Sequence, residues 1–153
     1  FDTADDIPDT DVATSATLKF VCISGQFTNS FTDSISLVSS APAANDALVN
    51  GDYDSLGTTK FATDIALAAL TVDSSTFNQF TLNAAGLDAI DVDGVTKLGI
   101  RGLADLSNSE PTGGDDEATY ILIAPADESL SSDKRPVLTV THGPAFTPSV
   151  IMF

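Results

Sequence analysis

The stretch that decides the fold is ATLKFVCI, residues 16–23, because apolar and polar residues alternate along its first half. One face of an extended strand would carry four residues of this stretch: Ala16, Leu18, Phe20 and Cys22. Thr17 and Lys19 would point to the opposite face. Such a period of two predicts a β-strand with one buried face.

Five further runs have the composition of strands, and turn-forming residues separate them. The runs are DSISLVSS (33–40), FNQFTLN (77–83), TKLGIRG (96–102), ATYILIA (118–124) and PVLTVTH (136–142). β-Branched and aromatic residues dominate these runs, whereas Gly, Asn, Asp, Ser and Pro fill the gaps between them. ATYILIA is apolar on both faces, which favours a central or doubly covered strand. Many short strands with turns between them predict an all-β fold, an antiparallel jelly-roll β-sandwich.

Two segments have helical character. NAAGLDAI, residues 83–90, begins with Asn83 as an N-cap, so we expect a helical turn there. TDIALAAL, residues 63–70, fits either a helical turn or a strand, because a short apolar run does not distinguish the two. The expected architecture therefore contains one or two short helical turns.

The composition limits the classes of partner. The chain has 153 residues, which suggests one domain, and 22 acidic against 6 basic residues give a net charge of −16. This charge repels nucleic-acid phosphates and anionic membranes, so neither is an expected partner. No run approaches the roughly 20 apolar residues that span a bilayer. The acidity fits a well-solvated surface, a saline habitat or the binding of divalent cations.

Catalytic chemistry has little support in the sequence. The chain has one Cys and one His, Cys22 and His142, and both fall in predicted strands. No G-x-S-x-G elbow is present, and two residues are too few for a zinc site. Pairs of carboxylates are expected by chance among 22 acids, so they do not indicate a glycosidase. We therefore expect a non-enzymatic protein with no cofactor.

Calcium is the one metal for which the sequence offers candidates. Asp91 and Asp93 precede Gly94, which resembles the first half of a calcium-binding loop, although the Glu that completes an EF-hand is absent. The second candidate site is the acidic cluster Asp115, Asp116 and Glu117. A solvated turn is the alternative interpretation of each.

Sugar binding by β-sandwich domains usually depends on exposed aromatic side chains. This chain has no Trp and two Tyr residues. Tyr53, in the turn NGDYDSLG (50–57), is the better candidate for an exposed ligand-binding ring, whereas Tyr120 is expected to pack in its strand.

Three phrases occur in the order known from one family. They are FDTADDIPDTDVATSATLKF (1–20), TKLGIRGLAD (96–105) and KRPVLTVTH (134–142). Together they resemble the DNRLRE-type domain, a jelly-roll β-sandwich related to a family of carbohydrate-binding modules. The resemblance implies an extracellular, cell-surface or virion-associated protein. Within the second phrase, Arg101 and Asp105 lie four residues apart across a strand end, where an ion pair would hold a loop down.

The C-terminal sequence GPAFTPSVIMF departs from the family pattern. We divide the chain into a sandwich domain, residues 1–142, and an apolar extension, residues 143–153. Gly143 and Pro144 are expected to break the closing strand. Family members carry strands before the first phrase, and nothing precedes it here, so we expect an open sheet edge that the extension fills.

The extension could fill such an edge in its own chain or in a neighbouring copy. The candidate assembly residues are Phe146, Val150, Ile151, Met152 and Phe153. Docking in a neighbour would produce a homo-oligomer, filament or lattice. The sequence thus favours a structural or assembly subunit, and the alternative is a carbohydrate-binding or adhesion module that takes a polysaccharide.

Overall fold

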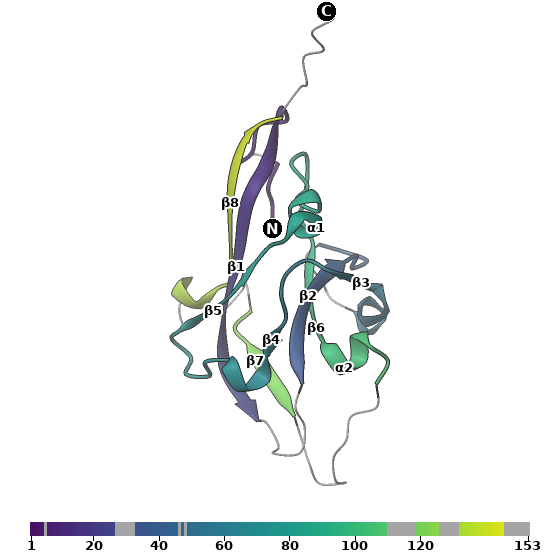
Figure 1. Cartoon of the computed structure of the whole chain (residues 1–153), viewed down its shortest axis with the longest axis vertical. Helices are drawn as coiled ribbons and strands as arrows, with labels where there is room; N and C mark the ends of the chain where they lie inside the picture. The colour runs from purple at the N-terminus through teal and green to yellow at the C-terminus, as the bar shows by residue number, and fades with distance from the viewer. Residues whose placement is uncertain are drawn as a thin grey trace, which may run out of the picture.

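The computed structural model describes residues 1–4, 6–26, 33–45, 47, 49–109, 119–125 and 132–145. Within them, eight strands form two four-stranded antiparallel sheets, which face each other in Figure 1. The first sheet contains β1 (Asp11–Gln26), β5 (Phe77–Thr81), β7 (Tyr120–Ile123) and β8 (Val137–Pro144). The second contains β2 (Ser34–Ser40), β3 (Leu56–Lys60), β4 (Ile65–Ala66) and β6 (Leu98–Gly102). The predicted antiparallel β-sandwich is confirmed.

The long strand β1 organises the first sheet. It pairs with β5 through residues 17–21, with β8 through residues 11–19 and with β7 through residues 22–26. Where β1 passes from Cys22 to Ser24 the register shifts, as in a β-bulge. β1 and β8 continue as a two-stranded ribbon beyond the rest of the sandwich (Figure 1).

The alternation in residues 16–23 places the core. All four residues that were predicted to share a face are at most 5% exposed: Ala16, Leu18, Phe20 and Cys22. Phe20 stacks on Phe80 of β5 with ring centroids 5.6 Å apart. Leu37 of β2 is fully buried in the same cluster, so the core lies between the two sheets.

Strand β2 is buried on both faces, although its sequence alternates serines with apolar residues. Ile35 and Leu37 belong to the core, while Ser36 and Val38 on the other face are fully buried as well. The hydroxyl of Ser36 donates to Asp64 at 2.7 Å, which supplies the partner that a buried polar group requires.

The short helices follow the predicted segments. Helix α1 (Ala84–Asp88) begins after Asn83, whose side-chain oxygen accepts a hydrogen bond from the Gly86 nitrogen at 3.0 Å. The N-cap prediction is therefore confirmed. TDIALAAL forms both of the expected alternatives in succession, because β4 is followed directly by the 3₁₀ turn η2 (Leu67–Ala69). The remaining helical elements are η1 (Asn50–Ser55), α2 (Leu103–Leu106) and η3 (Ser132–Lys134).

Two expectations about single strands are wrong. β7 is not covered on both faces: among the described residues it pairs only with β1, and Tyr120 and Leu122 are about half exposed. The face that carries Tyr120 and Leu122 is exposed, while Ile121 and Ile123 of the opposite face pack against the core. The closing strand also does not break at Gly143, because β8 continues to Pro144 through pairing with Val12 and Asp11 of β1.

Among the described residues, no helix is both long and apolar enough to cross a membrane.

Candidate functional site

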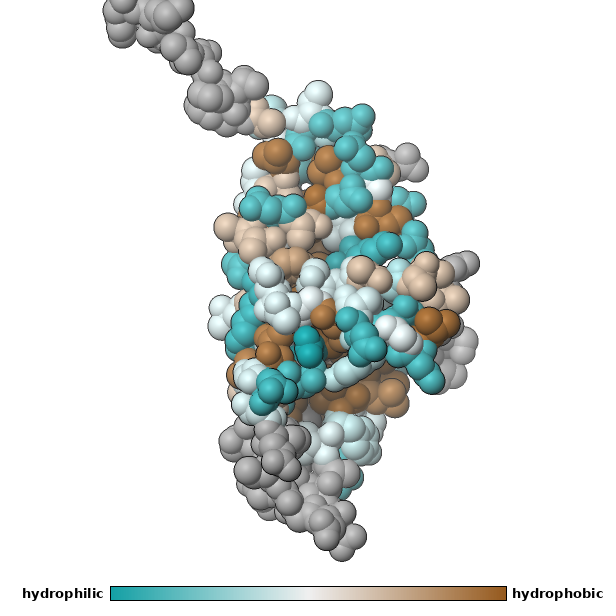
Figure 2. Space-filling view, turned by 90° about the vertical axis from the view of Figure 1, so that its right-hand side faces the viewer, coloured by the Kyte–Doolittle hydropathy of each residue, from teal (hydrophilic) through white to brown (hydrophobic). Residues whose placement is uncertain are grey.

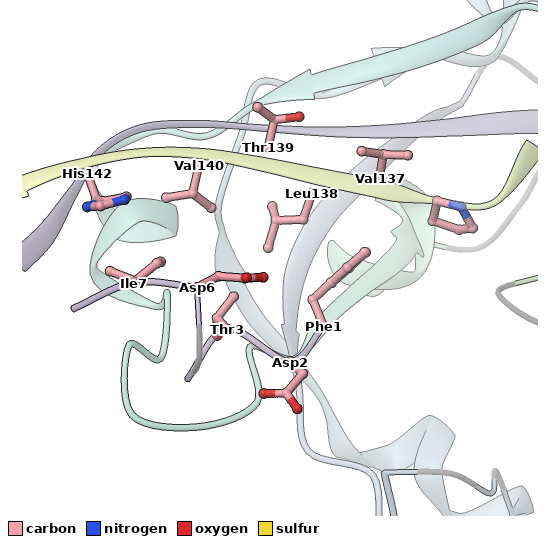
Figure 3. Close-up of a pocket in the computed structure, with 11 residues that line it drawn as sticks. Phe1, Asp2, Thr3, Asp6, Ile7, Val137, Leu138, Thr139, Val140 and His142 are labelled. Atoms are coloured by element: carbon pink, nitrogen blue, oxygen red, sulfur yellow. The ribbon is translucent and has the colours of Figure 1, made fainter. Parts of the chain in front are cut away.

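A groove of about 500 Å³ lies between β8 and the N-terminal segment, residues 1–7 (Figure 3). Leu138 and Val140 point from β8 toward this segment, whereas Thr139 points away (Figure 3). The apolar part of the lining comes mainly from Phe1, Ile7, Leu138 and Val140. The volume falls within the range of about 300–1,000 Å³ that is usual for ligand-binding pockets.

The far wall of the groove is the N-terminal segment, which a buried polar network holds in place. Phe1 and Thr96 exchange two backbone hydrogen bonds of 2.9 Å, and the nitrogen of Thr3 donates to the Gly94 carbonyl at 3.0 Å. The hydroxyls of Thr3 and Thr96 are 2.9 Å apart, and both residues are at most 5% exposed. The segment is therefore a fixed wall, anchored to residues 91–96.

The near wall is β8, and the register shows which of its backbone groups face away from β1. The carbonyl of Ala16 accepts a hydrogen bond from the Leu82 nitrogen, so the backbone groups of Ala16 point toward the β5 side of β1. Successive residues of a strand point their backbone groups to opposite sides, so the N–H and C=O of Thr17 point toward β8. Thr17 pairs with Thr139, whose N–H and C=O therefore point back to β1. The neighbouring residues of β8 alternate with Thr139, so the backbone groups of Leu138, Val140 and His142 point away from β1.

None of these three residues makes a backbone hydrogen bond to another described segment. Prolines stand at both ends of this edge. Pro136 and Pro144 occupy the next outward positions on either side, and proline has no N–H to donate. The bond from the Ala145 nitrogen to the Thr10 carbonyl, 3.1 Å long, confirms that the alternation continues to this end. The open edge of β8 thus offers N–H donors at three positions, flanked by two that offer none.

Three titratable side chains line the groove among the described residues. Asp2 and Asp6 line it from the N-terminal segment, and His142 lines it from β8. The Nδ1 atom of His142 lies 2.7 Å from a carboxylate oxygen of Asp11 on β1. The groove therefore combines an apolar interior with carboxylates, and it suits a ligand that carries no negative charge.

Cys22 and His142, the one Cys and the one His of the chain, lie apart in the structure. Cys22 is fully buried in the core, where desolvation raises the pKa of its thiol. His142 lies beside Ala13, nine positions along β1 from Cys22, so the two do not form a nucleophile–base pair. Across the described residues, no three His, Cys, Asp or Glu side chains gather where they could hold a metal ion.

The predicted pair Arg101 and Asp105 belongs to a second surface cluster, which also contains Tyr53. The Nε of Arg101 donates to a carboxylate oxygen of Asp105, and its Nη1 donates to the Gly57 carbonyl at 3.5 Å. These two contacts join β6 and α2 to Gly57, the second residue of β3.

Tyr53 is the most exposed aromatic residue of the described chain, at 60%. Its hydroxyl donates to Asp105, and this hydrogen bond raises the pKa of the Tyr53 phenol. Two hydrogen bonds lower the pKa of the Asp105 carboxyl. The larger effect comes from the Arg101 guanidinium and the smaller one from the Tyr53 hydroxyl. Sequence reasoning paired Arg101 with Asp105 and named Tyr53 separately, and the structure brings the three together.

The same cluster lies on the side of the molecule that Figure 2 shows. β3 and α2 stand at the right-hand edge of Figure 1, and Figure 2 turns this edge to the viewer. Brown apolar spots on this face are separated by polar ones (Figure 2). The face therefore resembles an ordinary solvated surface rather than one wide apolar patch.

The first calcium candidate has a structural explanation. An Asp91 carboxylate oxygen accepts from the Asp93 nitrogen at 3.1 Å, which closes the turn on itself. The Asp91 nitrogen donates to the Thr96 hydroxyl at 3.0 Å, so the turn is part of the network that anchors the N-terminal segment. The second candidate, Asp115, Asp116 and Glu117, lies outside the described residues.

The five candidate assembly residues, Phe146, Val150, Ile151, Met152 and Phe153, also lie outside the described residues. The groove itself was missed at the level of sequence, because it joins residues that are more than 130 positions apart. One signal was available: Pro136 and Pro144 lie eight positions apart in an alternating run, so both fall on the same edge of the strand.

No known family model matches the chain, and no curated protein or solved structure matches it significantly.

Proposed function

We propose that the protein is a non-catalytic structural subunit that assembles with other copies through the open edge of β8. The observation that carries the proposal is the apolar groove beside an edge with three outward-facing N–H groups. An extended segment that joins such an edge gains backbone hydrogen bonds from the strand and affinity from the groove. The resemblance to DNRLRE-type domains supports a place on the cell surface or on a virion.

The charge of the subunit sets the conditions for its assembly. Two copies at −16 repel each other at low ionic strength. The Debye length falls from about 10 Å at 0.1 M salt to about 3 Å at 1 M, so added salt weakens this repulsion. Assembly is therefore expected to increase with salt, which would suit a saline environment.

The first test is the oligomeric state of the full chain. Sedimentation and electron microscopy should show oligomers, filaments or particles that grow with protein and salt concentration. Val140→Pro removes one outward N–H and should leave a folded monomer, because edge strands tolerate proline at such positions. His142→Pro is a second variant with the same purpose on an exposed residue.

The control for these variants is Thr139→Pro, which removes an N–H that points to β1. This change should destabilise the fold by about 1–3 kcal/mol, because it leaves the facing acceptor on β1 unpaired. Thermal unfolding followed by circular dichroism separates the two effects. A full chain that remains monomeric at high concentration and high salt would exclude the proposed function.

A carbohydrate-binding or adhesion module is the second candidate. The observation in its favour is the exposed ring of Tyr53, held by Asp105 beside the Arg101 guanidinium. Aromatic faces with nearby polar groups are a common means of binding sugars.

Glycan binding should depend on the ring of Tyr53 and not on its hydroxyl. On a glycan array, Tyr53→Ala is expected to lose at least about tenfold in affinity, which corresponds to about 1.4 kcal/mol. Tyr53→Phe keeps the ring and is the matched control, with a smaller loss. If the unmodified protein binds neither neutral nor acidic glycans, this second candidate is rejected.

A further inference from the structure

We infer that the segment which fills the groove is the C-terminal extension of a second copy, with residues 149–153 added to β8 as a short strand. This inference rests on the proposed function and names the partner of the same site. Three independent features carry it: the length of the open edge, the charge of the extension and the point at which the chain leaves β8.

The open edge of β8 is short enough for residues 149–153 to cover it. The outward N–H groups of β8 are limited to positions 138–142 by Pro136 and Pro144. Residues 149–153, SVIMF, contain no proline, whereas Pro148 cannot itself donate to a sheet. A strand of five residues is typical, and it would cover the open edge between the two prolines.

The charge of the extension fits the groove. Residues 136–153 form the longest stretch of the chain without Asp, Glu, Lys or Arg. Asp2 and Asp6 at the groove would repel an acidic segment, and most other parts of this chain carry acids at short intervals. The extension can therefore enter the groove without bringing a charge of the same sign.

The place where the chain leaves β8 favours entry of the extension into the groove of a neighbouring copy rather than into its own groove. Ala145 is still bonded to Thr10, at the tip of the β1–β8 ribbon. To enter its own groove, the chain would have to reverse within the few residues after Ala145. The sequence FTPS, residues 146–149, lacks the Gly, Asn or Asp of tight hairpin turns, and Thr147 before Pro148 favours an extended backbone.

A donated strand would present two unequal faces. Val150 and Met152 fall on one face of a strand over residues 149–153, and Ile151 and Phe153 fall on the other. One face enters the groove and the other stays at the surface. Two double variants therefore act as controls for each other: Val150→Asp with Met152→Asp, and Ile151→Asp with Phe153→Asp.

A mixing experiment with full-length variants tests the inference. A donor-defective chain carries the more damaging of the two Asp pairs, and an acceptor-defective chain carries Val140→Pro or His142→Pro. Each alone should need at least about tenfold higher concentration than the unmodified chain to assemble, because one half of the contact is missing. Mixed together, they should form complexes of two chains and no longer species, since a single intact groove meets a single intact extension.

The outcomes separate this inference from the proposed function. If the unmodified chain assembles and the donor-defective chains assemble equally well, another surface mediates assembly and the inference fails alone. A mixture that stays monomeric, or equal loss from both Asp pairs, also overturns it. If the unmodified chain is monomeric and an Asp pair lowers its melting temperature, the extension packs in its own groove. In that case both proposals fail.

Discussion

Phe80→Ala is expected to lower the free energy of unfolding by about 3–5 kcal/mol, the usual cost of emptying a buried phenylalanine site. Phe80 is 1% exposed, and its ring stacks on Phe20 at the centre of the core between the two sheets. The first sheet cannot close over the space that the ring would leave, because its strand β1 is held by β5 on one side and by β8 on the other. Urea unfolding followed by circular dichroism measures the loss.

Phe77→Ala is the matched control for this prediction. Phe77 lies three residues earlier on the same strand, but its ring is 38% exposed on the outer face of the sheet. Its removal should cost less than half as much. Equal losses from the two variants would show that burial between the sheets is not the main source of stability.

Gly86→Ala is expected to destabilise the protein by about 1–3 kcal/mol, as overpacking of a tight site usually does. Helix propensity alone predicts the opposite sign, because Ala is favoured over Gly by about 1 kcal/mol within helices. A Cβ atom on Gly86 would lie 2.6 Å from the carbonyl oxygen of Phe61. This carbonyl is fixed because it accepts a hydrogen bond from the Asn83 nitrogen at 2.8 Å.

Gly51→Ala provides the control for the glycine prediction. Gly51 lies in η1, and a Cβ atom there would meet nothing within 4 Å. No described glycine has a positive φ angle, so this substitution should be neutral or stabilising by up to about 1 kcal/mol. A higher melting temperature for Gly86→Ala would contradict the close contact with Phe61.

The sequence predicted the fold where local pattern and burial agree. The alternation from Ala16 to Cys22 placed the central strand correctly, because only one of its faces had to enter the core. Ser36 shows the limit of this reasoning. A serine between two core residues of a strand would ordinarily face solvent, but Asp64 comes from another segment and provides a buried partner. A single alternating run does not contain that information.

The candidate site was only partly predictable for a similar reason. Arg101 and Asp105 are four residues apart, so their pairing could be expected from local spacing. The addition of Tyr53 to the pair depends on how η1 and α2 meet, which local spacing does not encode. The groove depends on contacts between opposite ends of the chain, which no local pattern contains. Gly143 and Pro144 were predicted to break the closing strand, but β1 is long enough to keep both of them paired.

The two prolines that flank the open edge of β8 also affect how the protein behaves at high concentration. An unprotected edge of eight residues could pair with the same edge of another molecule and continue into fibrous aggregates. With Pro136 and Pro144 in outward positions, only a short interval can accept a strand. The prolines thus hinder edge-to-edge aggregation, but they leave room for one short strand to add to β8. If subunits assemble as proposed, such protection would limit aggregation of those that have not yet assembled.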